Sequence, residues 1–97
     1  MIEKSGNELR VTGSMLVADA TVLLQSGREL LQAERGSAEV VFDLSAVDET
    51  DSSALGVVFG LLRTARQLGV AMRINHPPAS MISLAALYGV SDSLPLA

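Results

Sequence analysis

The sequence predicts an α/β fold: one small domain over residues 1–97, with about four strands in a mostly parallel sheet and helices that cross over between strands. Three observations predict it. A hairpin pattern opens the chain, a β-branched apolar run occupies residues 39–44, and two long apolar periodicities of helical spacing flank that run. Strands that alternate with helices usually form parallel sheets with right-handed crossovers.

The first half of the chain contains four expected elements. Short strands at residues 2–4 and 9–12 flank the turn residues Ser-Gly-Asn-Glu, which indicates a β-hairpin. Apolar residues spaced three and four apart predict a helix over about residues 18–34 with one apolar stripe. The run EVVFDL at residues 39–44 is typical of a central buried strand.

The second half contains three more elements. A second helix is expected to begin near Ser52 and to end before Gly69, a glycine well placed at the C′ position. Residues 70–74 alternate in polarity and predict a strand. Two prolines precede a third helix, expected over about residues 79–88 and stopped at Gly89, and the tail after it is expected to be a loop.

The composition excludes several classes of protein. Hydrophobic residues make up 48% and charged residues 19% of the chain, which excludes a disordered tail. A net charge of −4 argues against broad binding of nucleic acid or anionic membranes. The chain has no cysteine, and we see no signal peptide and no apolar run near the roughly 18–20 residues that span a bilayer. We therefore expect a soluble cytoplasmic domain.

The second helix is apolar around more than half of its circumference. One stripe must face the sheet and consists of Leu55, Val58, Phe59, Leu62 and Ala65. The other stripe consists of Ala54, Val57, Leu61, Thr64 and Leu68. A neighbouring helix could cover the second stripe, or the stripe could be an exposed docking surface, since apolar patches on small domains often mark interfaces.

Two glycines one turn apart, Gly56 and Gly60, remove side-chain bulk from one strip of this helix. Each costs about 1 kcal/mol relative to alanine in a helix interior. Either the fold needs close packing there, or the backbone or a bulky side chain of a partner lies against the strip.

The stretch DLSAVDETDSSALG at residues 43–56 places an acidic turn before two serines, Ser52 and Ser53, at the start of the second helix. Asp51 and the serines suit helix capping. A phosphoryl group on Ser52 would also suit a helix N-terminus, although the neighbouring Asp48, Glu49 and Asp51 would repel it and lessen the benefit.

Catalysis is not expected. There is no nucleophile elbow around the serines, no glycine-rich phosphate loop, and only one histidine, His76, which is expected to be solvent-exposed. The acidic residues between positions 43 and 51 could bind magnesium, but such a cluster is more typical of a solvated or partner-facing surface. We assign no catalytic, cofactor-binding or metal-binding residue.

The pattern DLSxVxxxDSSxLG, after an apolar strand and before a long helix, resembles the STAS domain family, which includes the bacterial anti-sigma-factor antagonists (SpoIIAA-like proteins). In that family the Ser or Thr after the aspartate of the turn is the switch residue, which corresponds to Ser52. Two residues depart from the family: Ala54, where many members have glycine, and Glu49, where switch proteins usually carry an apolar or neutral residue.

The C-terminal segment LAALYGVSDSLP narrows the resemblance to the MlaB family, the STAS subunits of an ABC transporter that moves phospholipids between the membranes of Gram-negative bacteria. The resemblance implies a non-catalytic subunit that binds and regulates an ATP-binding partner (MlaF-like), in complex with a permease (MlaE-like), cytoplasmic and associated with the inner membrane through that complex. The alternative is an anti-sigma-factor antagonist switched by phosphorylation of Ser52. The expected partner-binding or switch residues are Asp51, Ser52, Ser53, Gly56, Val57, Gly60, Leu61, Thr64 and Tyr88, with Ser52 as the possible phosphorylation site.

Overall fold

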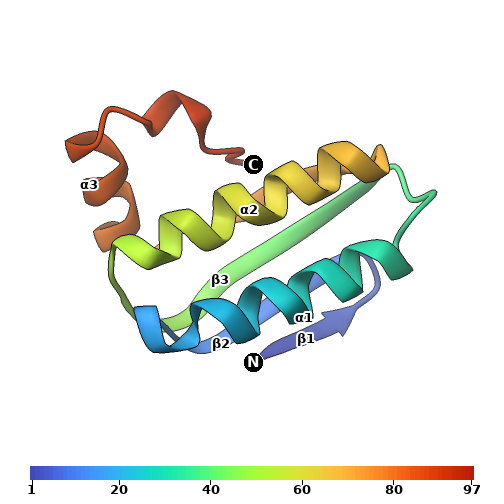
Figure 1. The fold of residues 1–97 in the computed structure, drawn as a ribbon, viewed down its shortest axis with the longest axis horizontal. Helices are drawn as coiled ribbons and strands as arrows, with labels where there is room; N and C mark the ends of the chain where they lie inside the picture. The colour runs from blue at the N-terminus through green and yellow to red at the C-terminus, as the bar shows by residue number, and fades with distance from the viewer.

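The computed structural model describes residues 1–97 as two layers, a four-stranded sheet with helices on one of its faces (Figure 1). Strands β1 (Ile2–Ser5) and β2 (Glu8–Met15) form the predicted antiparallel hairpin. Strands β3 (Glu39–Thr50) and β4 (Ala71–Asn75) follow in spatial order, and the pairs β2–β3 and β3–β4 are parallel. The predicted fold class, a mostly parallel α/β sheet, is confirmed.

The helices lie close to their predicted positions. Helix α1 (Ala20–Ala33) follows a short 3-10 helix, η1 (Val17–Asp19), and connects β2 to β3. Helix α2 (Ser52–Leu68) connects β3 to β4. It ends at Gly69, whose φ of 71° lies in the left-handed region that glycine adopts without strain.

Helix α3 (Ala79–Leu87) lies beside the N-terminal half of α2 (Figure 1). The tail beyond it is more ordered than the predicted loop. It forms a 3-10 turn, η2 (Ser91–Ser93), and then runs beside β4, where the Ile74 amide donates to the Pro95 carbonyl at 2.7 Å.

The acidic stretch before α2 is strand, not the predicted turn. Residues 45–50 extend β3 along the second half of β2, which is also longer than its pattern indicated. The register shifts twice along this pairing, between Arg10 and Thr12 and between Gly13 and Ser14. These irregularities break the polar–apolar alternation on which the prediction of strand length depends.

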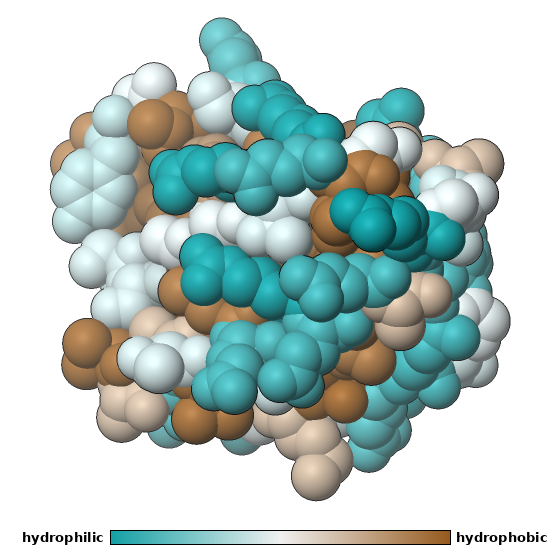
Figure 2. All heavy atoms as spheres, turned by 45° about the vertical axis from the view of Figure 1, so that its right-hand side comes forward, coloured by the Kyte–Doolittle hydropathy of each residue, from teal (hydrophilic) through white to brown (hydrophobic).

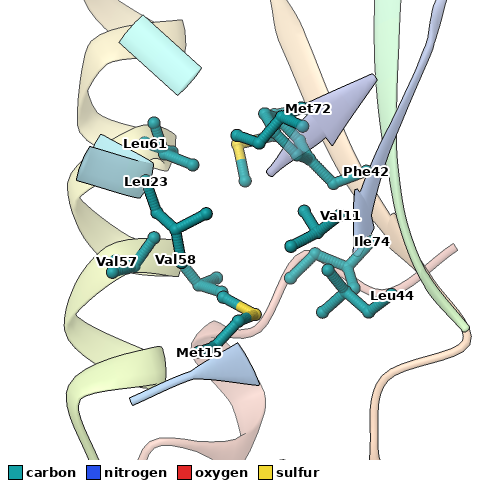
Figure 3. Close-up of a pocket in the computed structure, with 11 residues that line it drawn as sticks. Val11, Met15, Leu23, Phe42, Leu44, Val57, Val58, Leu61, Met72 and Ile74 are labelled. Carbon is teal, nitrogen blue, oxygen red and sulfur yellow. The ribbon is translucent and has the colours of Figure 1, made fainter. Parts of the chain in front are cut away.

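The core lies between the helices and one face of the sheet. Figure 3 shows Val57, Val58 and Leu61 of α2 facing strand residues that include Phe42 and Ile74. The only space among these side chains is a cavity of about 10 Å³ with entirely hydrophobic lining, so it is a packing gap rather than a ligand site. The opposite face of the sheet is polar and partly exposed, with ion pairs such as Arg73–Glu39 at 3.1 Å.

Candidate partner-docking site

Asp51 fixes the start of α2. Its side chain accepts a hydrogen bond from the Ser53 amide at 2.8 Å, which caps the helix, and a second from the Val17 amide at 3.0 Å. The hydrogen bond from Val17 is the main cause of a lowered pKa of Asp51, and the bond from Ser53 adds to it against the opposing effect of burial. The carboxylate is therefore ionised at neutral pH and ties α2 to η1.

Two further contacts hold the same end of the molecule. The Asp19 carboxylate accepts hydrogen bonds from the Ser14 hydroxyl at 2.7 Å and the Leu16 amide at 3.0 Å, and these bonds lower its pKa. The hydroxyls of Thr50 and Ser80 hydrogen-bond to each other and join the end of β3 to the start of α3. These hydrogen bonds hold the N-terminal ends of α1, α2 and α3 at the end of the molecule where Ser52 lies.

Ser52 is exposed at the first position of α2, as expected of a switch or contact residue. The preceding residues Asp48 and Glu49 are also exposed, which makes the approach to Ser52 acidic. The helix N-terminus favours a negatively charged group at this place, whereas the carboxylates of Asp48 and Glu49 repel one.

Gly56 lies one turn after Ser52 and is exposed. Apart from the adjacent residues and the backbone of its own helix, a Cβ placed on it would meet no heavy atom within 4 Å. Since a helical glycine costs about 1 kcal/mol relative to alanine, and nothing within the chain uses the space, the free molecule has no packing reason for this residue.

The second apolar stripe of α2 is not an exposed docking surface; on this point the docking interpretation is wrong. Val57 and Leu61 are each only 3% exposed, because they pack between α1 and the sheet. Gly60 is buried too, and a Cβ on it would lie 2.7 Å from a methyl group of Leu24 in α1. The hydroxyl of Thr64 already has partners within the chain: it donates to the Gly60 carbonyl and accepts from the Arg28 guanidinium.

The solvent-facing side of the helices is correspondingly polar. Figure 2 shows mostly hydrophilic and neutral residues across this view, with hydrophobic residues in small separate areas. The expected partner-binding residues therefore divide into two groups. Asp51, Ser52, Ser53 and Gly56 lie around the start of α2, and Tyr88 is exposed at the end of α3; Val57, Gly60, Leu61 and Thr64 instead make contacts within the chain.

Exposed apolar side chains lie in η1 and in α3, two helical segments that adjoin α2. Val17 in η1 is 72% exposed, and beyond α2 the third helix and its end expose Ile82, Leu87 (75%) and Tyr88 (57%). Of these residues, only Tyr88 was expected at the surface. The signal for Ile82 and Leu87 is the sequence ASMISLAAL, which has apolar residues on every side of a short helix and so cannot bury all of them.

Other polar groups form no second site. His76 is exposed, as predicted, and its Nδ1 lies 3.2 Å from the Asp43 carboxylate. Burial raises the pKa of Asp43, but hydrogen bonds from Ser45 and His76 outweigh that effect and lower it overall. No group of three or more acidic or histidine side chains is placed to hold a metal ion.

A four-stranded, mostly parallel sheet covered on one face, with Asp51 capping helix α2 and Ser52 exposed at its first position, defines a STAS-type domain. The chain belongs to the family described as "Mlab, STAS domain", whose model matches residues 1–96. No helix has both the length and the apolar character needed to span a bilayer.

Among curated proteins, the chain is similar to the intermembrane phospholipid transport system binding protein MlaB of Haemophilus influenzae. The two are 32% identical over 53 residues, which is 55% of this chain and 50% of that protein. The matched segment therefore spans about half the length of the relative.

Solved structures show the same fold at low sequence identity. The Thermotoga maritima protein tm1081, described as an anti-sigma factor antagonist, superposes with a TM-score of 0.76 at 15% identity, over 99% of this chain and 83% of that one. The phosphorylated form of the Bacillus cell fate determinant SpoIIAA gives a TM-score of 0.68 at 15% identity, over 100% and 89% of the two chains.

Proposed function

We propose that this chain is a non-catalytic subunit that binds and regulates the cytoplasmic ATP-binding subunit (MlaF-like) of a phospholipid-trafficking ABC transporter. In this role it acts beside the permease (MlaE-like) in maintaining the lipid asymmetry of the outer membrane, and it reaches the inner membrane only through the complex. The family and the similarity to a phospholipid-transport MlaB protein support the choice of partner.

The observation that carries the docking surface is Gly56. An exposed helical glycine without neighbours destabilises the free domain, yet it leaves a flat strip next to Ser52 on which a partner can approach the helix backbone. Val17, whose amide donates to Asp51 at the start of α2, adds an exposed apolar side chain beside that strip, and α3 adds exposed Leu87 and Tyr88. We assign the partner contact to this surface, because the second stripe of α2 is already covered by α1.

The direct test is co-purification of the chain with an MlaF-like ATP-binding subunit from the same organism, using Gly56→Arg. Arginine has a higher helix propensity than glycine and meets open space at this position, so the variant should be at least as stable as the wild type. Its long side chain would nevertheless hold a partner away from Ser52. Gln67→Arg, exposed on the same side of α2 about 16 Å further along the axis, is the matched control.

We expect Gly56→Arg to lose the complex and Gln67→Arg to retain it. Ser52→Asp should also weaken the complex, because it adds charge beside Asp48 and Glu49. An intact complex with the well-folded Gly56→Arg variant would refute this docking surface.

The second candidate function is an anti-sigma-factor antagonist switched by phosphorylation of Ser52. The exposure of Ser52 at a helix N-terminus favours it, because a phosphate there would meet free amide groups. Mass spectrometry of protein from cells distinguishes the two. A phosphoserine that Ser52→Ala abolishes, without co-purification of an ATPase, would favour the switch over the transporter subunit.

A further inference from the structure

A second surface of α2 carries charge that the chain itself does not neutralise. Arg63 and Arg66, one turn apart, are exposed on the C-terminal half of the helix. Neither takes part in any of the three ion pairs of the molecule, which use Lys4, Arg73 and His76. In a chain with net charge −4, two adjacent unpaired guanidiniums form a local positive site.

These arginines line a groove. The C-terminal residues 92–95 run opposite α2, and the space between the two walls is about 600 Å³, within the roughly 300–1,000 Å³ typical of ligand-binding clefts. Phe59 and Leu62 of α2 and Leu94 of the tail contribute apolar surface, while the tail also contributes one carboxylate, Asp92.

The outer wall of the groove is held in place. Leu94 is buried, the Pro95 carbonyl accepts a hydrogen bond from the Ile74 amide at 2.7 Å, and the Ala97 amide donates to the Ile74 carbonyl at 2.9 Å. The groove therefore exists before any ligand binds, which lowers the entropic cost of binding.

We infer that this groove binds an acidic peptide segment of a partner protein, one that offers carboxylates to Arg63 and Arg66 and an apolar side chain to Phe59. Guanidiniums pair with carboxylates in a bidentate geometry, and the apolar surface between the walls demands more than a free anion. An anionic membrane fits less well, because two arginines do not offset the acidic character of the whole chain.

The groove is independent of the surface around Ser52. Arg63 and Arg66 lie eleven and fourteen residues further along α2, so about 16–21 Å away along the helix axis. The inference does not depend on the identity of the ATP-binding partner.

The test uses the full chain and a synthetic array of peptides about twelve residues long. The peptides carry Asp or Glu together with Leu or Phe at varied spacings. The array is probed with the wild type, with Arg63→Glu/Arg66→Glu, and with Arg10→Glu/Arg35→Glu. The control pair is also exposed and without ion pairs, and it changes the net charge by the same amount. Circular dichroism confirms that each variant is folded.

We expect the strongest peptides, measured by fluorescence anisotropy, to bind Arg63→Glu/Arg66→Glu about tenfold more weakly and the control pair as well as the wild type. Replacing their acids by Asn and Gln should remove binding, as should raised salt. The inference is overturned if no peptide binds above background, if both charge-reversed pairs lose binding equally, or if phosphatidylglycerol vesicles bind through these arginines and peptides do not.

Discussion

Three glycines in the long helices should respond in opposite directions to the same substitution, alanine. Gly56 of α2 is exposed, and a Cβ there meets nothing within 4 Å. Gly27 of α1 is buried, and a Cβ there would lie 2.5 and 2.9 Å from the two terminal methyl groups of Leu61. Gly60 is intermediate, because the Cβ would approach a single methyl group of Leu24 at 2.7 Å.

The expected magnitudes follow from two opposing effects. Each substitution gains about 1 kcal/mol of helix propensity. At Gly56 nothing opposes that gain, so Gly56→Ala should stabilise the domain by about 1 kcal/mol. At Gly27 the buried Leu61 must move as a whole, and such overpacking costs about 1–3 kcal/mol, so the net effect should be a destabilisation of about 0–2 kcal/mol. At Gly60 the half-buried Leu24 can rotate away, and the two effects should nearly cancel.

Urea unfolding followed by circular dichroism at the helical band measures all three. With an m value of about 1 kcal/mol/M for a domain of this size, Gly56→Ala should raise the midpoint by up to about 1 M, and Gly27→Ala should lower it. If Gly27→Ala raised the midpoint as much as Gly56→Ala, the close packing of α1 on α2 would be refuted. In that case close packing would not explain Gly60, and Gly56 could no longer be assigned to a partner surface on the ground that it alone lacks a packing role.

Three further changes test other parts of the structure. Leu61→Asp should abolish cooperative unfolding, since it places an unpaired charge between α1 and α2; a stable, soluble variant would contradict the burial of this residue. Asp51→Ala removes the bonds to Val17 and Ser53. Because the folded-state pKa of Asp51 lies below its ordinary value of 3.8, its contribution is complete above about pH 5 and is lost as the pH falls through the folded value, so the urea midpoints of variant and wild type should converge in acid. Leu87→Asp, on an exposed side chain, should change stability by less than about 0.5 kcal/mol but weaken the ATPase complex, as measured by co-purification.

The positions of the elements could be predicted because most of them depend on local periodicity. The helical spacing in α1 and α2 and the glycine at position 69 are visible without knowledge of the rest of the fold. The extension of β3 could not be predicted, because residues 45–50 pair with β2 through an irregular register that leaves no alternation in the sequence. That pairing depends on two strands far apart in the chain.

The covering of the second stripe of α2 is also a property of the tertiary structure. The stripe itself is visible in the sequence, but its partner is α1, and only the arrangement of the two helices decides between burial and exposure. A complementary signal exists in α1, where Gly27 leaves room for Leu61. Glycines on both helices, each opposite a leucine of the other, favour an internal contact over an external one.

The two glycines of α2 thus have different causes although they lie one turn apart. Gly60 faces α1, and the fold explains it. Helix α2 packs against α1 and α3, and its exposed residues form one strip from Ser52 and Gly56 to Arg63, Arg66 and Gln67. The groove between α2 and residues 92–95 lies beside the C-terminal part of this strip. The charge along this strip changes from acidic near residues 48–51 to basic at Arg63 and Arg66. A surface that is narrow, partly without side chains and of opposite charge at its two ends can bind partners of different chemistry at each end, which is why the ATPase contact and the peptide groove can be tested, and can fail, separately.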